Sequence, residues 1–299
     1  MNDVNIVEVG ARDGLQNETK ILTVEQRVEL IQRLAASGLQ HIEAGSFVSP
    51  KWVPQMAGSD EVMQALHMDR KLKNLHLPVL TPNVQGYDRA ITAGAKEIAI
   101  FGAASETFSH KNINCSIAES LQRFEMISDQ AKVDGVAMRG YVSCLVHCPY
   151  EGVIKAQQVV PVVRQLFELG CYEVSLGDTI GRGTPKSIRL VLEALLSEFP
   201  AEKLALHCHD TYGMAIANIM TGLDMGIRTI DASVGGAGGC PYAKGASGNV
   251  ATEEVVYLLE NEGLNTGVNL TSLVETGHWL YQQLGKPVTS RVNQALYGH

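Results

Sequence analysis

Short apolar runs recur along the chain, and each is followed by a polar or glycine-rich loop and then by a segment of helical periodicity. We predict a buried strand at each of eight such runs: Asn5–Val9, His41–Gly45, Leu75–Leu80, Glu97–Phe101, Met138–Ser143, Glu173–Leu176, Leu204–His207 and Thr229–Ser233. Strands that alternate with helices pair in parallel through right-handed crossovers. Eight strand–helix units favour a closed (β/α)8 barrel, the TIM-barrel fold, over an open doubly wound sheet.

The segments between the runs carry helix start and stop signals. Thr23-x-x-Gln26 and Ser116-x-x-Glu119 are capping boxes, and Thr184-Pro185 places proline at a first helical position. Glycines stand where a helix should end and the next strand begin, at Gly38, Gly94, Gly170 and Gly226. These signals support the alternation of strands and helices.

The length fits one domain, because 299 residues suit a single α/β barrel of about 250 residues or more. We find no linker or low-complexity stretch that would mark a boundary. We therefore expect one catalytic domain over residues 1–299, with the barrel over about 1–261 and a short helical C-terminal extension over about 262–299. The first strand lacks the Gly-x-Gly-x-x-Gly turn of a dinucleotide-binding sheet, which argues against a Rossmann fold.

Charge and composition exclude two classes of protein. The chain holds 24 basic and 32 acidic residues, and this net charge of −8 argues against a nucleic-acid partner, which needs a basic face. No apolar run approaches the ~18 residues of a membrane span. The start carries neither a basic signal region nor an Arg/Ser-rich transit pattern. We therefore expect a cytoplasmic enzyme with a small-molecule substrate and no membrane partner.

Two of the predicted strands end in residues that suit a metal ion, at the strand ends where barrel active sites lie. Arg12-Asp13-Gly14 follows the first strand, and His207-Cys208-His209-Asp210 ends the seventh. Side chains two apart on a strand point the same way, so the two histidines can face one ion. With Asp13 and Asn249 as oxygen-ligand candidates, the mixed set suits Mg²⁺ or Mn²⁺ better than structural zinc.

A glycine-rich segment follows the eighth strand, from Ser233 to Asn249, and it contains Cys240 next to Pro241. So many glycines indicate a loop that needs unusual backbone angles or approaches a ligand closely. The Gly-Lys-Ser/Thr ending of a phosphate-binding loop is missing. Most of the six cysteines are interpreted as small buried hydrophobes, and none forms a Cys-x2-Cys pair. Cys240 is the exception, since a thiol in a top-face loop would be a liability unless it is used.

Two acids lie in otherwise apolar strands, Glu43 in the second and Asp178 at the end of the sixth. A buried carboxylate needs a partner, and Arg12 is the natural partner for either of them. We expect an ion pair that holds the Arg12 guanidinium where it can stabilise an enolate.

Six motifs together resemble the 3-hydroxy-3-methylglutaryl-CoA lyase family, and the resemblance spans nearly the whole chain. They are Arg12-Asp13-Gly14-Leu15-Gln16-Asn17-Glu18, Ser46-Phe47-Val48-Ser49-Pro50-Lys51-Trp52-Val53-Pro54-Gln55-Met56, Lys111-Asn112-Ile113-Asn114-Cys115-Ser116, Gly177-Asp178-Thr179-Ile180-Gly181, His207-x-His209-Asp210 and Gly239-Cys240-Pro241-Tyr242-Ala243-x-Gly245-Ala246-Ser247-Gly248-Asn249. The last motif is the most specific, because related barrel enzymes that condense acetyl-CoA lack this cysteine loop. One departure is that Gly235 and Ala237 replace an alanine and a leucine of the family pattern, which makes the loop smaller.

The resemblance implies a retro-Claisen cleavage of (S)-3-hydroxy-3-methylglutaryl-CoA to acetyl-CoA and acetoacetate, in a homodimeric enzyme. It implies that a divalent metal, Mg²⁺ or Mn²⁺, is held by Asp13, His207, His209 and Asn249. It implies catalytic roles for Arg12, Asp13, Glu43, Asp178, His207 and Cys240. It implies substrate contacts by Arg12, Gln16, Ser46, Asn112, Ser175 and Thr179. Cys240 would be the acid, and the base would be Asp13 or, as the weaker choice, His207.

Two other enzyme classes stay open. One is a lyase for a related 3-hydroxyacyl-CoA. The other is an acyl-CoA condensing enzyme of the isopropylmalate or homocitrate synthase type, which usually has a longer C-terminal portion than the about 40 residues after the last barrel helix here. A non-enzymatic barrel would be expected to have lost at least one ligand candidate, and all are present. The pathway, leucine degradation or ketone-body formation, stays open as well.

Overall fold

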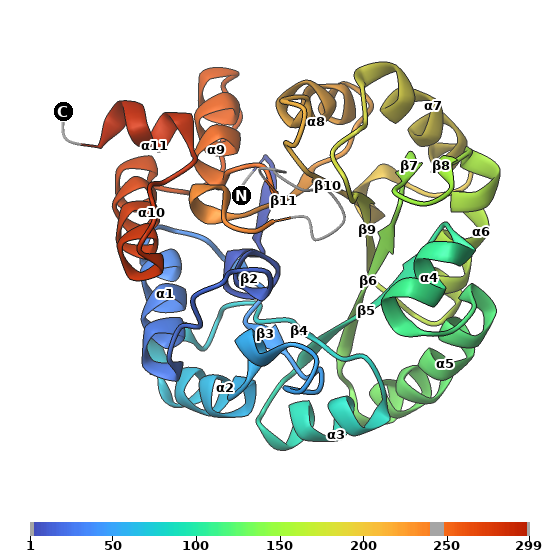
Figure 1. The fold of residues 1–299 in the computed structure, drawn as a ribbon, viewed down its shortest axis with the longest axis horizontal. Coiled ribbons are helices and arrows are strands. Elements are labelled where there is room, and N and C mark those ends of the chain that lie inside the picture. Colours follow the sequence, from blue (N-terminus) through green and yellow to red (C-terminus); the bar gives the residue numbers. More distant parts are fainter. Residues whose placement is uncertain (1–2, 240–247, 298–299) are drawn as a thin grey trace.

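A parallel sheet surrounded by helices forms the centre of the molecule (Figure 1). The computed structural model describes residues 3–239 and 248–297. The strands of the sheet are β1 (Asn5–Glu8), β2 (His41–Ile42), β3 (Gly45–Ser46), β4 (Val79–Leu80), β5 (Glu97–Ala103), β6 (Ala137–Ser143), β9 (Glu173–Asp178), β10 (Leu204–Cys208) and β11 (Thr229–Ala232). A separate antiparallel hairpin, β7 (His147–Cys148) and β8 (Gly152–Val153), lies in the connection after β6.

Strands β2 and β3 are two parts of one barrel strand, and this strand closes the sheet. The strand order is β2-β1-β11-β10-β9-β6-β5-β4-β3, so the two ends of the sheet are neighbouring stretches of the chain. Between them the N–H of Glu43 donates to the carbonyl of Glu8, and the N–H of Ala44 donates to the carbonyl of Pro78, each at 2.9 Å. The segment therefore pairs with both of its neighbours, and the predicted TIM-barrel fold is confirmed.

The helices form a ring outside the sheet (Figure 1). They are α1 (Val24–Ala36), α2 (Ser59–Met68), α3 (Val84–Thr92), α4 (Glu106–Ile113), α5 (Ile117–Asp134), α6 (Ala156–Glu168), α7 (Pro185–Leu196), α8 (Ala215–Asp224), α9 (Thr252–Asn261), α10 (Leu270–Leu284) and α11 (Arg291–Leu296). Short single turns accompany them in the described residues: the π-helical η1 (Gly10–Gly14) and the 3-10 turns η2 (Pro54–Met56), η3 (Arg70–Leu72), η4 (Ala201–Lys203) and η5 (Val234–Gly236).

The predicted capping boxes are confirmed at the starts of α1 and α5. The Thr23 hydroxyl accepts from the N–H of Gln26 at 3.2 Å, and the Gln26 side chain accepts from the N–H of Thr23 at 3.0 Å. These reciprocal bonds satisfy two amide donors that a helix start would otherwise leave unpaired. None of the helices in the described part of the chain is both long and apolar enough to cross a bilayer.

Side chains alternate between two environments along the barrel strands, as the period of two requires. On β10, Leu204 and Leu206 belong to the apolar core, whereas His207 faces Asp231 of β11. The core lies between the sheet and the surrounding helices. Inside the barrel, polar side chains from β6, β9 and β11 bond to one another, and they support the site described below.

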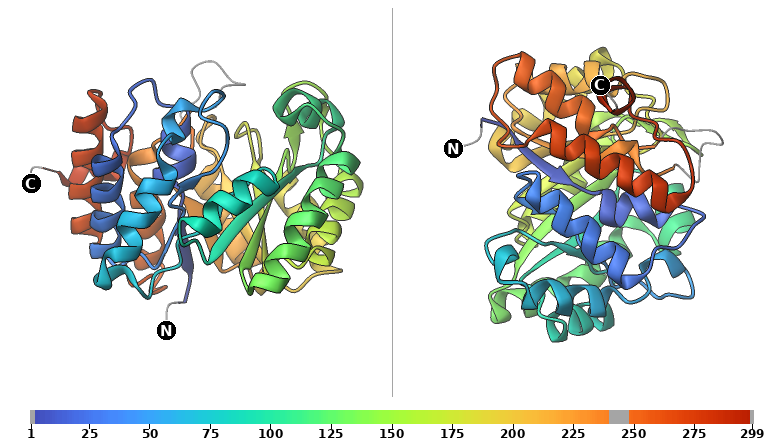
Figure 2. Two further views of the ribbon diagram at one scale, coloured as in Figure 1. Left: turned by 90° about the horizontal axis from the view of Figure 1, so that it is seen from below. Right: turned by 90° about the vertical axis from the view of Figure 1, so that its left-hand side faces the viewer.

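The C-terminal extension packs on the outside of the barrel. Helix α10 lies beside α1, and α11 contacts α9 and α10 (Figure 2). Residues after α10 also reach the start of the glycine-rich segment: the Thr289 hydroxyl donates to the carbonyl of Gly235 at 2.8 Å. A Cβ atom on Gly235 would lie 2.5 Å from the Tyr281 ring, and its φ is +65°. Glycine at this position therefore allows α10 to pack closely against η5.

Candidate active site

The end of β1 turns into η1, and this turn carries Arg12 and Asp13 into the mouth of the barrel. Glu8 holds the turn from below. Its Oε1 accepts from the N–H groups of Gly10 at 2.7 Å and Val234 at 2.9 Å, and the Thr252 hydroxyl donates to its Oε2 at 2.6 Å. Glu8 therefore ties η1 to η5 and to the start of α9, which fixes where Arg12 and Asp13 stand.

Arg12 is held between two carboxylates. Its Nε lies 2.7 Å from Oε2 of Glu43, and its Nη1 lies 2.7 Å from Oδ1 of Asp13. The guanidinium also lies over the ring of Tyr141, 5.6 Å from the centroid. Burial lowers the pKa of Arg12, but the charges of Glu43 and Asp13 outweigh burial and raise this pKa above its ordinary value. Of the two acids expected as partners, the structure places Glu43 against Arg12.

Asp178 has a different partner. Its Oδ2 accepts from the backbone N–H of Gly183 at 2.7 Å, in the loop that follows β9. Its Oδ1 is buried and has no hydrogen bond to any residue that the structure describes. Burial raises the pKa of Asp178 to about 6, although the backbone N–H groups of Gly183 and Arg182 act in the opposite direction. The backbone of this loop, rather than Arg12, therefore holds the carboxyl.

Asp13, His207 and His209 form a group that could hold a metal ion, since each offers a ligand atom within 4.8 Å of the others. The Nε2 of His207 lies 4.0 Å from Oδ2 of Asp13. Asn249 joins this group, because its Nδ2 donates to Oδ2 of Asp13 at 2.9 Å. Asn249 is brought there by an antiparallel bridge with His209.

The donor set fits a divalent cation. It combines imidazole nitrogen with carboxylate oxygen, and Asn249 can add an amide oxygen after rotation of its amide. The Nδ1 of His209 is buried and has no hydrogen-bond partner in residues 3–239 and 248–297, as suits a nitrogen that is free to bind a cation.

Burial and neighbouring charges keep Asp13 and His209 in metal-binding forms. Burial raises the pKa of Asp13, but the charges of Arg12, His207 and His209 outweigh it and lower this pKa to about 2. Burial and the neighbouring His207 lower the pKa of His209 to about 4. Asp13 is therefore ionised and His209 neutral at neutral pH, which are the forms that bind metals.

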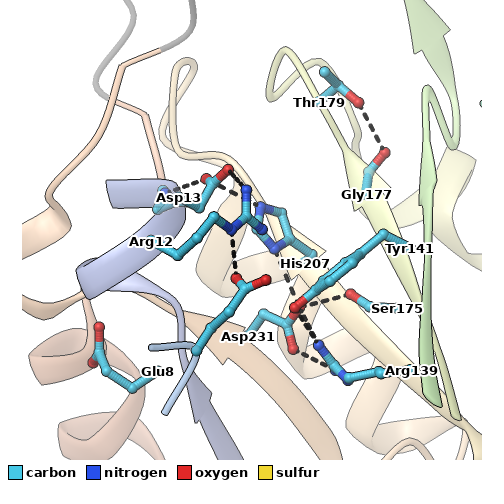
Figure 3. Close-up of polar contacts among 12 residues, drawn as sticks. Glu8, Arg12, Asp13, Arg139, Tyr141, Ser175, Gly177, Thr179, His207 and Asp231 are labelled. Atoms are coloured by element: carbon cyan, nitrogen blue, oxygen red, sulfur yellow. Dashed lines mark hydrogen bonds and ion pairs between the residues drawn. The ribbon is translucent and has the colours of Figure 1, made fainter. Parts of the chain in front are cut away.

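A buried polar network below the metal group was not predicted from the sequence (Figure 3). Arg139 donates through Nη2 to Oδ1 of Asp231 at 2.7 Å and through Nη1 to the hydroxyl of Tyr141 at 2.9 Å. Burial raises the pKa of Asp231, but Arg139 outweighs it and holds this pKa well below its ordinary value. The available signal was polar residues at every second position of buried strands, such as Arg139 and Tyr141 on β6.

The predicted substrate contacts lie at different depths. Gln16 is half-buried two residues after η1, and Asn112 is exposed near the end of α4. Ser46 is buried at the end of β3, and Ser175 is buried within β9, where its hydroxyl donates to Oδ2 of Asp231 at 2.7 Å. The Thr179 hydroxyl accepts from the N–H of Cys144 at 2.8 Å. Contact with a substrate remains a prediction for all of them.

Cys240 lies outside the described residues. The residues before it approach the loop after η1: the N–H of Gly238 donates to Oε1 of Glu18 at 3.3 Å, and Nδ2 of Asn17 donates to the carbonyl of Gly239 at 3.2 Å. Glu18 is itself paired with Lys286 at 2.6 Å. The described beginning of the cysteine segment is thus tied to the same part of the barrel mouth as Arg12 and Asp13.

Comparisons with known proteins agree over nearly the whole chain. The model of the HMGL-like family matches residues 3–279. The mitochondrial hydroxymethylglutaryl-CoA lyase of Bos taurus is 55% identical over 98% of this chain and 89% of its own length. The cytoplasmic 3-hydroxy-3-methylglutaryl-CoA lyase of Danio rerio is also 55% identical, over 98% of this chain and 86% of its own length. The crystal structure of hydroxymethylglutaryl-CoA lyase from Pseudomonas aeruginosa matches with a TM-score of 0.95 and 51% identity, over 99% of this chain and 97% of that chain.

Proposed function

The chain belongs to the HMGL-like family, and from this premise we propose that it is a metal-dependent carbon–carbon lyase that cleaves (S)-3-hydroxy-3-methylglutaryl-CoA to acetyl-CoA and acetoacetate. The observation that carries the proposal is the placement of the Arg12 guanidinium directly beside Asp13 of the metal-binding group, at 2.7 Å. A cation and a fixed guanidinium side by side suit a substrate with a hydroxyl, a carboxylate and a thioester carbonyl.

Asp13, His207, His209 and Asn249 would hold the divalent cation, for which we propose Mg²⁺ or Mn²⁺. When bound, the cation supplies a Lewis acid that polarises and orients the oxygens of the substrate.

Arg12 is proposed to stabilise the thioester enolate. Cleavage of the C2–C3 bond leaves its electron pair on C2, and the negative charge is shared with the thioester oxygen. Glu43 fixes the guanidinium before the reaction, so no reorganisation is needed when the charge develops. Ion pairing also keeps Arg12 protonated inside the barrel.

Proton movements complete the proposed reaction. Asp13 accepts the proton of the C3 hydroxyl, and the C3–O group becomes the ketone of acetoacetate. His207 is the weaker choice for this base. Cys240 donates a proton to C2, which becomes the methyl group of acetyl-CoA; a thiol with an ordinary pKa of about 8.5 suits this task.

The remaining residues are proposed to shape the substrate site. Asp178 supports the mouth of the barrel through the loop after β9. We propose that Gln16, Ser46, Asn112 and Thr179 contact the acyl-CoA. Ser175 is proposed to support the site through its hydrogen bond to Asp231. The assignments of Gln16, Ser46, Asn112 and Thr179 rest on the family motifs, and Ser46 and Thr179 also lie at the C-terminal ends of β3 and β9.

The domain organisation, oligomeric state and location of the enzyme are also proposals. We propose one catalytic domain over residues 1–299, a homodimer, and a cytoplasmic location, while the relatives carry both cytoplasmic and mitochondrial names. Service in leucine degradation or in ketone-body formation would follow from the products.

One assay tests the proposed function. The purified chain is stripped with EDTA, and release of acetoacetate from 3-hydroxy-3-methylglutaryl-CoA is measured with and without added Mg²⁺ or Mn²⁺. We expect release only with the metal. A parallel series supplies 3-hydroxyacyl-CoA analogues with other 3-substituents, and acetyl-CoA with 2-oxo acids. Faster turnover of an analogue, or condensation in place of cleavage, would replace the proposed substrate or reaction.

A further inference from the structure

Asp231 is a buried carboxylate on which three side chains converge. It lies on β11 and is 1% exposed. Its Oδ2 accepts from the Ser175 hydroxyl at 2.7 Å and from Nη1 of Arg139 at 3.1 Å, and lies 3.2 Å from Nδ1 of His207. Its Oδ1 accepts from Nη2 of Arg139 at 2.7 Å. Both oxygens are therefore engaged.

The strand register brings Asp231 to His207. The two residues are direct partners in the parallel pairing of β10 with β11, so their side chains leave the sheet on the same side. Arg139 reaches Asp231 from β6, which is not a neighbour of β11 in the sheet. Figure 3 shows the resulting chain from Arg139 through Asp231 to the His207 ring.

The two nitrogens of His207 consequently face different surroundings. Nδ1 faces Asp231, whereas Nε2 faces Asp13 at 4.0 Å. An ionised carboxylate can only accept a hydrogen bond. The proton of a neutral His207 therefore belongs on Nδ1, which leaves the lone pair of Nε2 directed toward Asp13.

We propose that Asp231 is a positioning residue that fixes the tautomer and the ring orientation of His207, so that Nε2 is presented to the divalent cation. Arg139 and Ser175 hold the carboxylate in place for this purpose. The inference rests on the proposed metal-dependent activity, and it adds a role for a carboxylate that does not touch the cation. Carboxylates behind metal-binding histidines orient the ring in this way and are typically worth about 10–100-fold in metal affinity or activity.

A purely structural role is the alternative, in which Asp231 only neutralises Arg139 inside the barrel. Glu173 provides the matched control for that role. It is 8% exposed, and its Oε1 accepts from Nε of the same Arg139 at 2.8 Å. Within the part of the chain that the structure describes, Glu173 makes no hydrogen bond or ion pair with His207, so the two acids share the arginine but not the histidine.

Asp231→Asn and Glu173→Gln are the variants that separate the two roles. Asparagine has one acceptor oxygen where aspartate has two. If the asparagine oxygen takes the place of Oδ1 and accepts from Arg139, the amide nitrogen takes the place of Oδ2 and faces Nδ1 of His207. The histidine proton must then move to Nε2, where it blocks the cation. Glutamine at position 173 can keep its oxygen toward Arg139 and changes nothing at His207.

The measurements are Mn²⁺ affinity, by counting free Mn²⁺ with electron paramagnetic resonance, and the His207 tautomer, by ¹⁵N NMR of the metal-free protein. We expect the Nδ1–H tautomer in the wild type and in Glu173→Gln. For Asp231→Asn we expect the Nε2–H form and about 10–100-fold weaker Mn²⁺ binding, while Glu173→Gln binds Mn²⁺ like the wild type. Circular dichroism at the assay temperature identifies the folded variants.

Several results would overturn the inference. One is a folded Asp231→Asn variant that binds Mn²⁺ with wild-type affinity. Another is a Glu173→Gln variant whose Mn²⁺ affinity falls as much as that of Asp231→Asn. If Asp231→Asn does not fold, the wild-type spectrum decides alone, because an Nε2–H tautomer of His207 contradicts the proposal. Failure of the proposed function is distinguishable: a chain that binds Mn²⁺ but does not cleave 3-hydroxy-3-methylglutaryl-CoA loses the lyase assignment, while the comparison of Mn²⁺ affinities still decides the role of Asp231.

Discussion

The Nε atom of Arg12 lies 2.7 Å from Oε2 of Glu43, and this ion pair joins the turn after the first strand of the barrel to the strand that closes it. The side chain of Glu43 has no exposed surface, and that of Arg12 is 8% exposed. Buried pairs of this kind contribute little net stability, but loss of one partner leaves an uncompensated charge. Their value here is that the guanidinium has one fixed position.

Arg12→Lys tests whether that geometry matters. Lysine offers a single ammonium group and cannot reach Glu43 and Asp13 as the forked guanidinium does. We expect kcat to fall by about 10²–10³, the range for loss of one preorganised donor. Steady-state kinetics with 3-hydroxy-3-methylglutaryl-CoA measure it. Arg89→Lys, in a half-exposed pair with Asp60, is the matched control and should keep wild-type kcat. A fully active Arg12→Lys variant would show that catalysis does not depend on the fixed position of the guanidinium.

His209→Ala tests the metal-binding group. Removal of one of the four candidate ligands should weaken Mn²⁺ affinity by about 100-fold or more, which exceeds the usual effect of an outer partner. Titration followed by electron paramagnetic resonance measures it. His67→Ala, which removes an exposed imidazole of α2, should leave the titration unchanged. An unchanged titration of His209→Ala would remove this residue from the ligand set.

Cys240→Ala tests the proposed proton donor. Loss of a general acid typically costs about 10²–10⁴ in rate, so we expect kcat to fall within that range while Mn²⁺ affinity stays at the wild-type value. Cys171→Ala is the control. It removes the thiol of a core residue that is 5% exposed, and the variant should keep activity. If Cys240→Ala retains wild-type kcat, the acid is another group.

Glu8 makes the stability of the protein depend on pH. Burial raises the pKa of Glu8 to about 7 from an ordinary value of 4.5, although hydrogen bonds from Thr252, Val234 and Gly10 act to lower it. Between these two values the folded state holds a proton that the unfolded state has lost. The stabilising contribution of Glu8 is therefore complete below the lower value and is lost as the pH rises through the upper one.

Glu8→Gln should remove this dependence. A glutamine can accept from Gly10 and Val234 through its oxygen and donate to Thr252 through its nitrogen. Relative to the wild type, the variant should gain stability as the pH rises from 5 to 7, with a slope of at most about 1.4 kcal/mol per pH unit. Urea unfolding at a series of pH values measures it. Glu275→Gln, at an exposed site on α10, controls for the substitution. A constant difference between Glu8→Gln and the wild type would contradict the prediction.

Much of the fold is readable from local pattern, because buried parallel strands are short apolar runs and helix ends carry their own capping residues. The third predicted strand shows where local pattern fails to predict the structure. We predicted Leu75–Leu80, but only Val79–Leu80 is paired as a strand. His76 makes just an isolated bridge with His41, because a strand needs a neighbour at the right register as well as a suitable sequence.

The candidate site divides in the same way. His207 and His209 share a direction because they are two residues apart in the extended backbone at the end of β10, a local property that the sequence alone reveals. Asp13 and Asn249 are 236 residues apart, and only the closed barrel brings their side chains within 2.9 Å. The family motifs named both residues without stating where they would meet.

What the sequence determined by itself was therefore the order of strands and helices, the caps and the pair of histidines, since each depends on neighbours within a few residues. The tertiary structure alone decided that Glu43 rather than Asp178 holds Arg12, and that Arg139 crosses the barrel from β6 to Asp231 on β11. Partners of buried charges are chosen by distance inside the folded barrel, because a charge without water must pair with whatever the packing of distant strands places beside it.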